Sequence, residues 1–352
     1  MLSRIFEPID GKACNLRTVL VTGSAGFIGY HLSKHLLAEG FRVVGFDGLT
    51  DYYDVALKER RHAMLNQNPG FSAKIARLED TDAINALVVR EKPDVIVHLA
   101  AQAGVRYSLE NPRAYVETNL VGTFNVMEAA RAHGCSHLLM ASTSSVYGAN
   151  TEMPFDEVQK TDTPLTLYAA TKKANESMAH SYAHLWKIPT TMFRFFTVYG
   201  PWGRPDMALF KFVRATLEGK PIDVYNHGNM ARDFTYVTDL VQGIRLLIDA
   251  VPQEPESPED IEPGDSLSPA GPYRVVNIGN SNQVKLTEFI DEIEKCLGIP
   301  IQRNFMEMQK GDVPATWANA DLLAKLTGYV PKTDVATGIK EFVNWYRDYY
   351  RT

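Results

Sequence analysis

A glycine-rich turn near the N-terminus constrains the fold of this chain more than any other feature. The segment Val19–Gly29 reads VLVTGSAGFIG, so that an apolar run leads through three glycines into a helical pattern. Gly23 permits a tight turn, Gly26 lets backbone amides approach a pyrophosphate, and Gly29 permits close packing of the helix on the strand. The pattern predicts a strand, turn and helix that bind a dinucleotide. The residues that we expect to contact the dinucleotide are Gly23, Ala25, Gly26, Phe27, Ile28 and Gly29.

The next apolar run, RVVGFD, ends in Asp47, eighteen residues after Gly29. An acid at the end of the second strand can accept hydrogen bonds from the ribose hydroxyls of the adenosine. The same carboxylate would repel the additional phosphate of NADP. The cofactor that we expect is therefore NAD.

Short apolar runs alternate with helical periods up to about Gly200, which predicts an α/β fold of the Rossmann type, a doubly wound parallel sheet. Beyond Gly200 the pattern is less regular, and we expect a smaller substrate-binding α/β part. The predicted division is an N-terminal extension (1–15), an NAD-binding domain (16–200, with about 230–250 returning to it) and a part that binds mainly the nucleotide sugar (201–352). Residues 251–272 are rich in Pro, Ser and acids and are expected to form an exposed loop.

Composition and charge exclude several classes of function. The net charge is −6 and the pI about 5.9, so no basic face for nucleic acid is expected. The three cysteines, Cys14, Cys135 and Cys296, lack metal-ligand spacing, and we expect neither a metal site nor disulfides. No run approaches the ~20 apolar residues of a membrane span. The expected location is the cytoplasm.

A tyrosine and a lysine, Tyr168 and Lys172, are four residues apart in a predicted helix from about Tyr168 to Trp186. This spacing places both side chains on one face. A phenol has a pKa near 10, so its anion must be stabilised before it can act as a base at neutral pH. The ammonium and an oxidised nicotinamide would provide that stabilisation by direct attraction.

These motifs make the chain resemble the extended short-chain dehydrogenase/reductases, which include nucleotide-sugar epimerases and dehydratases. The resemblance runs from Thr18 to Tyr346 and rests on TGSAGFIG, TNLVGT, STSSVYG, YAATK and RDFTYV. Two longer blocks, AAQAGVRYSLENP and RFFTVYGPWGRPDMA, are similar to blocks of UDP-glucuronate 4-epimerases.

The resemblance implies NAD-dependent 4-epimerisation of UDP-glucuronate to UDP-galacturonate through a transient 4-keto sugar. Tyr168 would take the proton of the 4-hydroxyl, Lys172 would stabilise the phenolate, and Thr143 would relay the proton. The NAD is regenerated in each cycle. Relatives pair through the helices near 111–133 and 168–186, which implies a homodimer.

The row of hydroxyls in STSSVYG separates the reactions that this family performs. Dehydrating relatives carry Asp-Glu directly after the threonine, where this chain has Ser144 and Ser145, which can neither protonate a leaving group nor remove a carbon-bound proton. Decarboxylating relatives read Thr-Ser-Glu. The alternatives that stay open are a UDP-glucuronate decarboxylase, a 4-epimerase of another UDP-sugar, and a non-catalytic NAD-sensing protein.

The resemblance also implies further contacts. The cofactor is expected to lie against Leu78, Ala100, Ala101, Gln102, Asn119 and Ser142, and Arg77 stands where relatives carry an acid that reaches the adenine. The UDP-sugar is expected to contact Arg106, Ser144, Ser145, Thr197, Arg204, Phe210, Tyr225, Arg232 and Asp312. Within this set, Arg204 is expected to face the sugar carboxylate, because its fork matches that group.

Overall fold

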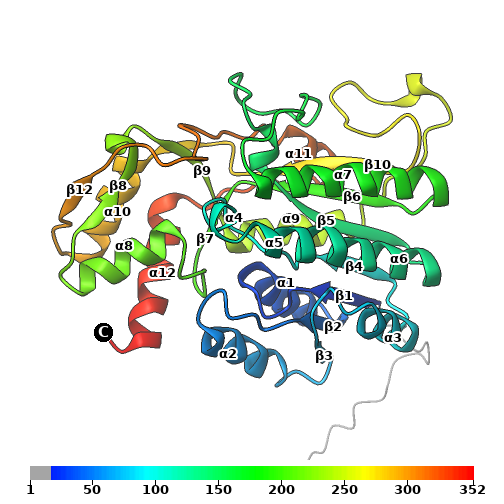
Figure 1. The fold of residues 1–352 in the computed structure, drawn as a ribbon, viewed down its shortest axis with the longest axis horizontal. Helices are drawn as coiled ribbons and strands as arrows, with labels where there is room; N and C mark the ends of the chain where they lie inside the picture. Colours follow the sequence, from blue (N-terminus) through cyan, green and yellow to red (C-terminus); the bar gives the residue numbers. More distant parts are fainter. Residues whose placement is uncertain (1–16) are drawn as a thin grey trace, which may run out of the picture.

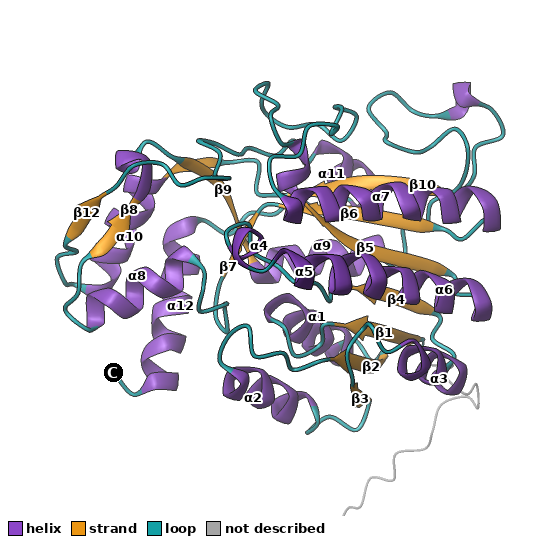
Figure 2. Cartoon of the chain, in the orientation of Figure 1, coloured by secondary structure: helices purple, strands orange, loops and turns teal. Residues whose placement is uncertain are grey.

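Seven strands, all parallel, form the central sheet of the computed structural model, which describes residues 17–352 (Figures 1 and 2). The predicted N-terminal extension (1–15), including Cys14, lies outside the described residues. In spatial order the strands are β10 (Tyr273–Ile278), β6 (Thr190–Phe195), β5 (His137–Thr143), β4 (Val95–His98), β1 (Thr18–Thr22), β2 (Arg42–Asp47) and β3 (Phe71–Ile75). The order reverses between β1 and β4, which opens a crevice at their carboxyl ends.

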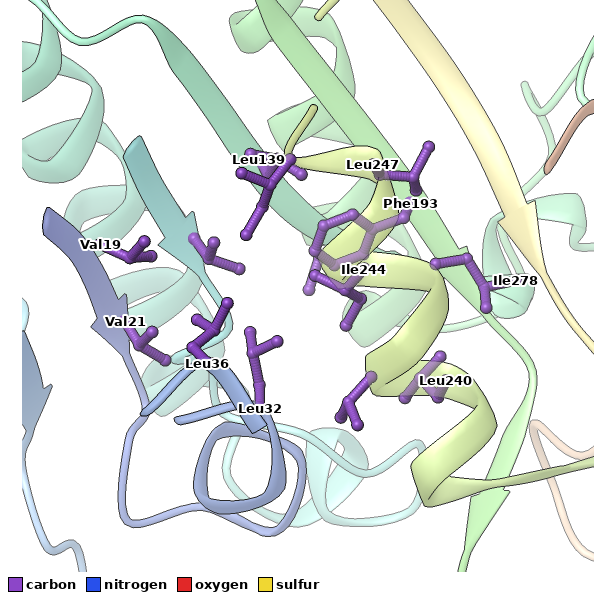
Figure 3. Packing of buried hydrophobic residues seen from close by; sticks show 14 of the residues in the cluster. Val19, Val21, Leu32, Leu36, Leu139, Phe193, Leu240, Ile244, Leu247 and Ile278 are labelled. Carbon is purple, nitrogen blue, oxygen red and sulfur yellow. The ribbon is translucent and has the colours of Figure 1, made fainter. Parts of the chain in front are cut away.

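Alternate side chains of these strands point to opposite faces, and each face is covered by helices. On one face Val19, Leu139 and Phe193 pack against α1 (Phe27–Ala38), α9 (Val237–Leu247) and α11 (Asp321–Thr327), as Figure 3 shows for α1 and α9. On the other face Leu20 and Met140 pack against α3 (Thr81–Glu91), α6 (Thr123–His133) and α7 (Leu167–Trp186). The helix α2 (Val55–Leu65) follows β2 and packs on α1. The doubly wound α/β prediction is confirmed.

A smaller part with its own hydrophobic core lies beside the carboxyl ends of the sheet (Figure 1). Its strands form two small sheets, of which the first joins β7 (Thr197–Tyr199), β9 (Ala231–Tyr236) and β11 (Gln283–Lys285), and the second joins β8 (Ile222–Val224) and β12 (Arg303–Phe305). The helices around this core are α8 (Ala208–Leu217), α10 (Leu286–Leu297) and α12 (Val335–Tyr350).

Two segments beyond residue 200 belong to the large sheet layer rather than to the smaller part. The helix α9 packs against α1, and β10 pairs with β6 as the edge strand. The acidic stretch 251–272 connects them and contains a short 3-10 turn (η4, Pro258–Asp260). Its end is fixed to the sheet, because Arg274 donates to Asp265 at 2.8 and 2.9 Å.

Of the two long helices predicted from the sequence, one is continuous in the structure and the other is interrupted. The helix expected from Tyr168 is α7, and the prediction is confirmed. The helix expected from about Asn111 to His133 is interrupted, because α5 (Pro112–Tyr115) and α6 are joined by a π-helical segment, η1 (Val116–Gly122). This segment places Asn119 against the loop that follows β4, where its amide bonds Gln102. No helix within residues 17–352 is both long and apolar enough to cross a bilayer.

Candidate active site

A cavity of about 1320 Å³ lies at the carboxyl ends of β1, β2, β4, β5 and β6 and is closed on its other side by the smaller part. The structure brings nearly all predicted site residues to this one cavity. Three predicted residues do not line it, namely Ala25, Asn119 and Phe210. The cavity is thus shared by the cofactor residues and the sugar residues of the sequence analysis.

The glycine-rich turn has the geometry that a bound pyrophosphate needs. Gly23 has φ +73°, and its N–H donates to Phe46 O at 2.7 Å. A Cβ on Gly29 would lie 2.0 Å from Gly23 O, so only glycine allows the helix to start this close to the strand. The first amides of α1 have no partner within the helix and are free to meet an anion. These residues fit a dinucleotide.

Asp47 lies at the end of β2 and lines the cavity. Its Oδ2 accepts the N–H of Ala25 at 2.9 Å, and its Oδ1 accepts the N–H of Leu49 at 2.8 Å. Both oxygens keep a lone pair for ribose hydroxyls. Ala25 itself is buried behind the turn and serves this contact through its backbone. Lys58 of α2, which was not predicted from the sequence, is buried, also lines this end of the cavity and bonds Thr50 O.

The catalytic candidates Thr143, Tyr168 and Lys172 meet where β5 ends beside α7. Burial raises the pKa of Tyr168, while the hydrogen bond to Thr143 and the charge of Arg204 lower it. Burial lowers the pKa of Lys172 to about 8, and its ammonium donates to Ala141 O at 3.0 Å. The lysine therefore stays charged at neutral pH and can stabilise a phenolate on the same helix face.

The hydroxyl row divides into two functions. Thr143 Oγ1 accepts the N–H of Ser145 at 3.2 Å and lies 3.3 Å from the hydroxyl of Ser145, at the cavity wall. Ser142 lines the cavity as predicted, but its hydroxyl donates to Glu176 at 2.6 Å. Glu176 in turn forms a buried two-point ion pair with Arg194 at 2.9 and 3.0 Å. Ser144 and Ser145 both line the cavity.

Arg204 lines the cavity, but one edge of its guanidinium is already occupied. Its Nε donates to Asp206 Oδ1 at 3.0 Å, and Nη2 donates to Oδ2 of the same carboxylate. The hydroxyl of Tyr52 donates to Asp206 at 3.1 Å. The Nη1 edge has no protein acceptor among the described residues, and it remains available to a substrate carboxylate. Thr197 lies at the start of β7 on the same cavity. Neither Asp206 nor Tyr52 was predicted from the sequence as a site residue.

At the other end of the cavity, three residues that are distant in sequence come together. Arg106 donates to Asp312 at 2.9 Å, and its guanidinium lies 4.6 Å from the ring centre of Tyr225. Arg232 lines the cavity and donates to the backbone oxygen of Val313 at 2.7 Å. Burial lowers the pKa of Arg232. Arg106 therefore belongs with the residues that were expected at the nucleotide.

Two expectations need correction. Phe210 was expected to contact the UDP-sugar, but it is buried in the smaller core, where its ring centre lies 5.9 Å from that of Phe342 and 5.3 Å from that of Tyr346. Phe212, on another face of α8, lines the cavity instead. Asn119 is fully buried and holds the backbone of Gln102 at 2.8 and 3.0 Å, so it supports the cavity wall from behind.

The residues expected near the adenine are also placed by the structure. Arg77 lines the cavity and pairs at 3.2 Å with Glu79, a carboxylate that lines the same cavity. Leu78, Ala100 and Ala101 line the same wall. Within the part of the chain that the structure describes, no group of three His, Cys, Asp or Glu side chains could hold a metal ion.

Comparisons with known proteins agree with this site. Residues 19–264 match the model of the "NAD dependent epimerase/dehydratase family". A "Probable UDP-glucuronate 4-epimerase" of Rhizobium meliloti is 56% identical over 94% of this chain and 97% of its own length. "UDP-glucuronate 4-epimerase 2" of Arabidopsis thaliana is 44% identical over 95% of this chain and 76% of its own length.

A solved structure resembles the whole fold. The UDP-glucuronic acid 4-epimerase from Bacillus cereus, crystallised with UDP-glucuronic acid and NAD, aligns with a TM-score of 0.84 and 30% identity. The alignment covers 95% of this chain and 100% of that one. The turn, the Tyr168–Lys172 pair and the extent of these matches lead to one conclusion: the chain belongs to the NAD-dependent epimerase/dehydratase family.

Proposed function

We propose that the chain interconverts UDP-glucuronate and UDP-galacturonate by inverting carbon 4 of the sugar, with NAD as its cofactor. The observation that carries this proposal is a single cavity that joins Tyr168, Thr143 and Lys172 to the free edge of Arg204. The named activity of the Rhizobium, Arabidopsis and Bacillus relatives supports the same substrate. We assign the NAD to residues 16–200 and 230–250, and the nucleotide sugar mainly to 201–352.

The residues of the chain act on the proton and on the position of the sugar. Burial raises the pKa of Tyr168 above its ordinary value, so the phenolate that takes the proton of the 4-hydroxyl depends on the positive charges of Lys172 and of bound NAD. Thr143 holds the same oxygen. Lys172 keeps the phenolate charged through attraction to its ammonium. When bound at these residues, NAD would supply the acceptor, and later the donor, of the hydride of carbon 4. The proton on Tyr168 then restores the hydroxyl.

The difficult step is to keep the carboxylate. The 4-keto sugar is a β-keto acid, and it loses carbon dioxide most readily when the bond to the carboxylate stands perpendicular to the keto plane. Arg204, Thr197 and Ser145 line the cavity beside Tyr168 and supply donors that hold the carboxylate in another orientation. The pair with Asp206 fixes the guanidinium before the substrate arrives.

The test is to incubate the purified protein with UDP-glucuronate and NAD and to analyse the products by mass spectrometry and NMR. The expected product has the mass of the substrate and galacto configuration at carbon 4. A UDP-pentose formed with carbon dioxide would favour the decarboxylase, and turnover of UDP-glucose alone would favour another 4-epimerase. NAD binding without turnover of any UDP-sugar would favour a sensing protein.

We further propose a cytoplasmic homodimer. The helices α6 and α7 lie side by side (Figure 1) and leave large apolar side chains exposed, with Phe124 at 46% and Trp186 at 44%. A second copy that packs the same helices against them would bury this face.

A further inference from the structure

Arg61 is a buried cation that the site described above does not use. It lies on the inner face of α2 and is 0% exposed. Its Nη1 donates at 2.8 Å to both Ala25 O and the hydroxyl of Tyr53, and its Nη2 donates to Trp202 O. All of these acceptors are neutral, and no carboxylate of residues 17–352 forms an ion pair with it. Its Nε has no hydrogen-bond partner among these residues.

Two of the acceptors of Arg61, the backbone oxygens of Ala25 and Trp202, belong to segments that are distant in sequence and that both adjoin the site. Ala25 lies inside the glycine-rich turn, and its N–H is held by Asp47 at 2.9 Å. The peptide units of Ala25 are therefore fixed on one side by Asp47 and on the other by Arg61. Trp202 lies two residues before Arg204, which lines the cavity and whose Nη1 has no acceptor among the described residues. One guanidinium thus joins the cofactor turn to the loop that carries the carboxylate contact.

A buried cation without a counter-ion is costly, because it has lost its water without gaining an opposite charge. Burial is the main cause of the lowered pKa values of His31 and Lys58. The positive charge of Arg61 lowers both pKa values as well. A dinucleotide pyrophosphate is an anion, and it binds at the turn whose carbonyl Arg61 holds. Cofactor binding would therefore compensate a charge that the protein alone leaves unpaired.

We propose that Arg61 is a positioning residue that couples the NAD turn to the Arg204 loop, so that bound cofactor holds Arg204 in the orientation that protects the sugar carboxylate. Arg61 itself touches neither ligand, because it does not line the cavity. It acts through Ala25 O on one side and Trp202 O on the other. The proposal deepens the proposed function and rests on it for the role of Arg204.

The side reaction provides the readout. When the 4-keto sugar is not held, the bond between carbons 5 and 6 breaks, its electron pair is delocalised into the keto group, carbon 5 takes up a proton, and carbon dioxide leaves. The ratio of decarboxylated product to UDP-galacturonate therefore reports how well Arg204 is positioned. NAD affinity, measured by calorimetry without any UDP-sugar, reports how well Arg61 holds the glycine-rich turn.

Two substitutions separate charge from geometry. Arg61→Met removes the charge and both carbonyl bonds, and we expect NAD affinity and the product ratio each to worsen at least about tenfold. Arg61→Lys keeps the charge but cannot span both carbonyl groups, so NAD affinity should change less than about threefold while the decarboxylated fraction still rises. The control is Arg60→Met, on the exposed face of the same helix, which should behave as the wild type.

The outcomes discriminate among the explanations. A folded Arg61→Lys protein with the wild-type product ratio would overturn the coupling, and it decides the question even if Arg61→Met does not fold. Unchanged NAD affinity in folded Arg61→Met would overturn the link to the turn. If the wild type makes no UDP-galacturonate, the proposed function fails, whereas the NAD measurements still test the role of Arg61 at the turn.

Discussion

Replacement of Arg194 by methionine tests whether the buried ion pair behind the hydroxyl row holds that part of the site together. The substitution removes two charge-assisted hydrogen bonds to Glu176, at 2.9 and 3.0 Å, each contributing about 1.5–3 kcal/mol. Glu176 would keep the hydroxyl of Ser142 at 2.6 Å and the ammonium of Lys173 at 3.5 Å. With this partial compensation, we expect the free energy of unfolding to fall by about 3 kcal/mol at neutral pH.

The loss should also depend on pH. In the wild type, burial raises the pKa of Glu176, whereas Arg194 and Ser142 lower it. The lowering effects together are larger, so the pKa of Glu176 lies below the ordinary value of 4.5. This stabilisation is present above pH 4.5 and is lost as the pH falls through the folded-state pKa. Without Arg194, burial dominates and the pKa of Glu176 rises. The difference between variant and wild type should therefore shrink in acid.

Urea denaturation followed by circular dichroism, with saturating NAD at several pH values, measures the effect. The double variant Arg194→Met, Glu176→Leu should recover at least about 2 kcal/mol, because the carboxylate that paired with Arg194 is no longer left buried without its partner. The control is Arg214→Met, which breaks an exposed ion pair with Glu218 at 3.0 Å on α8 and should change stability little. A loss in Arg194→Met no larger than in Arg214→Met would refute the reasoning.

Three further predictions concern the site. Tyr168→Phe should lower turnover of UDP-glucuronate by about 10²–10⁴-fold without weakening NAD binding, whereas Tyr115→Phe, whose hydroxyl bonds only backbone oxygens, should retain most activity. Gly29→Ala should weaken NAD binding at least about tenfold in calorimetry, because its Cβ would lie 2.0 Å from Gly23 O; an unchanged affinity would contradict the role of the turn. Lys172→Met should be more stable than the wild type near pH 7, and the gap should narrow by up to about 3 kcal/mol as the pH rises from about 8 to 10.5. The reason is that the unfolded chain binds the proton that the buried lysine has released, and a gap that stays constant in urea denaturation would contradict it.

The parts of the site that follow strand ends could be predicted from the sequence. Gly23, Asp47 and Thr143 come directly after or at the ends of buried strands, and parallel strands bring their carboxyl ends to one edge. The helix spacing of Tyr168 and Lys172 needed no knowledge of the rest of the chain. Such residues are placed by local structure and by the topology that the alternating pattern implies.

Residues placed by tertiary packing could not be predicted in the same way. Arg61 reads as one basic residue in the helical run ALKERRH, and only the fold shows that it is buried while Arg60 is exposed. Phe210 and Phe212 differ by two positions on α8, and the sequence alone does not tell which one faces the cavity. The π-helical turn of η1 rotates Asn119 onto the loop after β4, which no simple period reveals.

The late return of the chain at β10 limits how the molecule can be divided. The fragment covered by the family match ends at residue 264, before this strand, and would leave β6 as an unpaired, apolar edge. An edge of this kind invites aggregation. The smaller part therefore cannot be exchanged as a separate module without opening the large sheet. New sugar specificities would have to arise through substitutions within the intact chain.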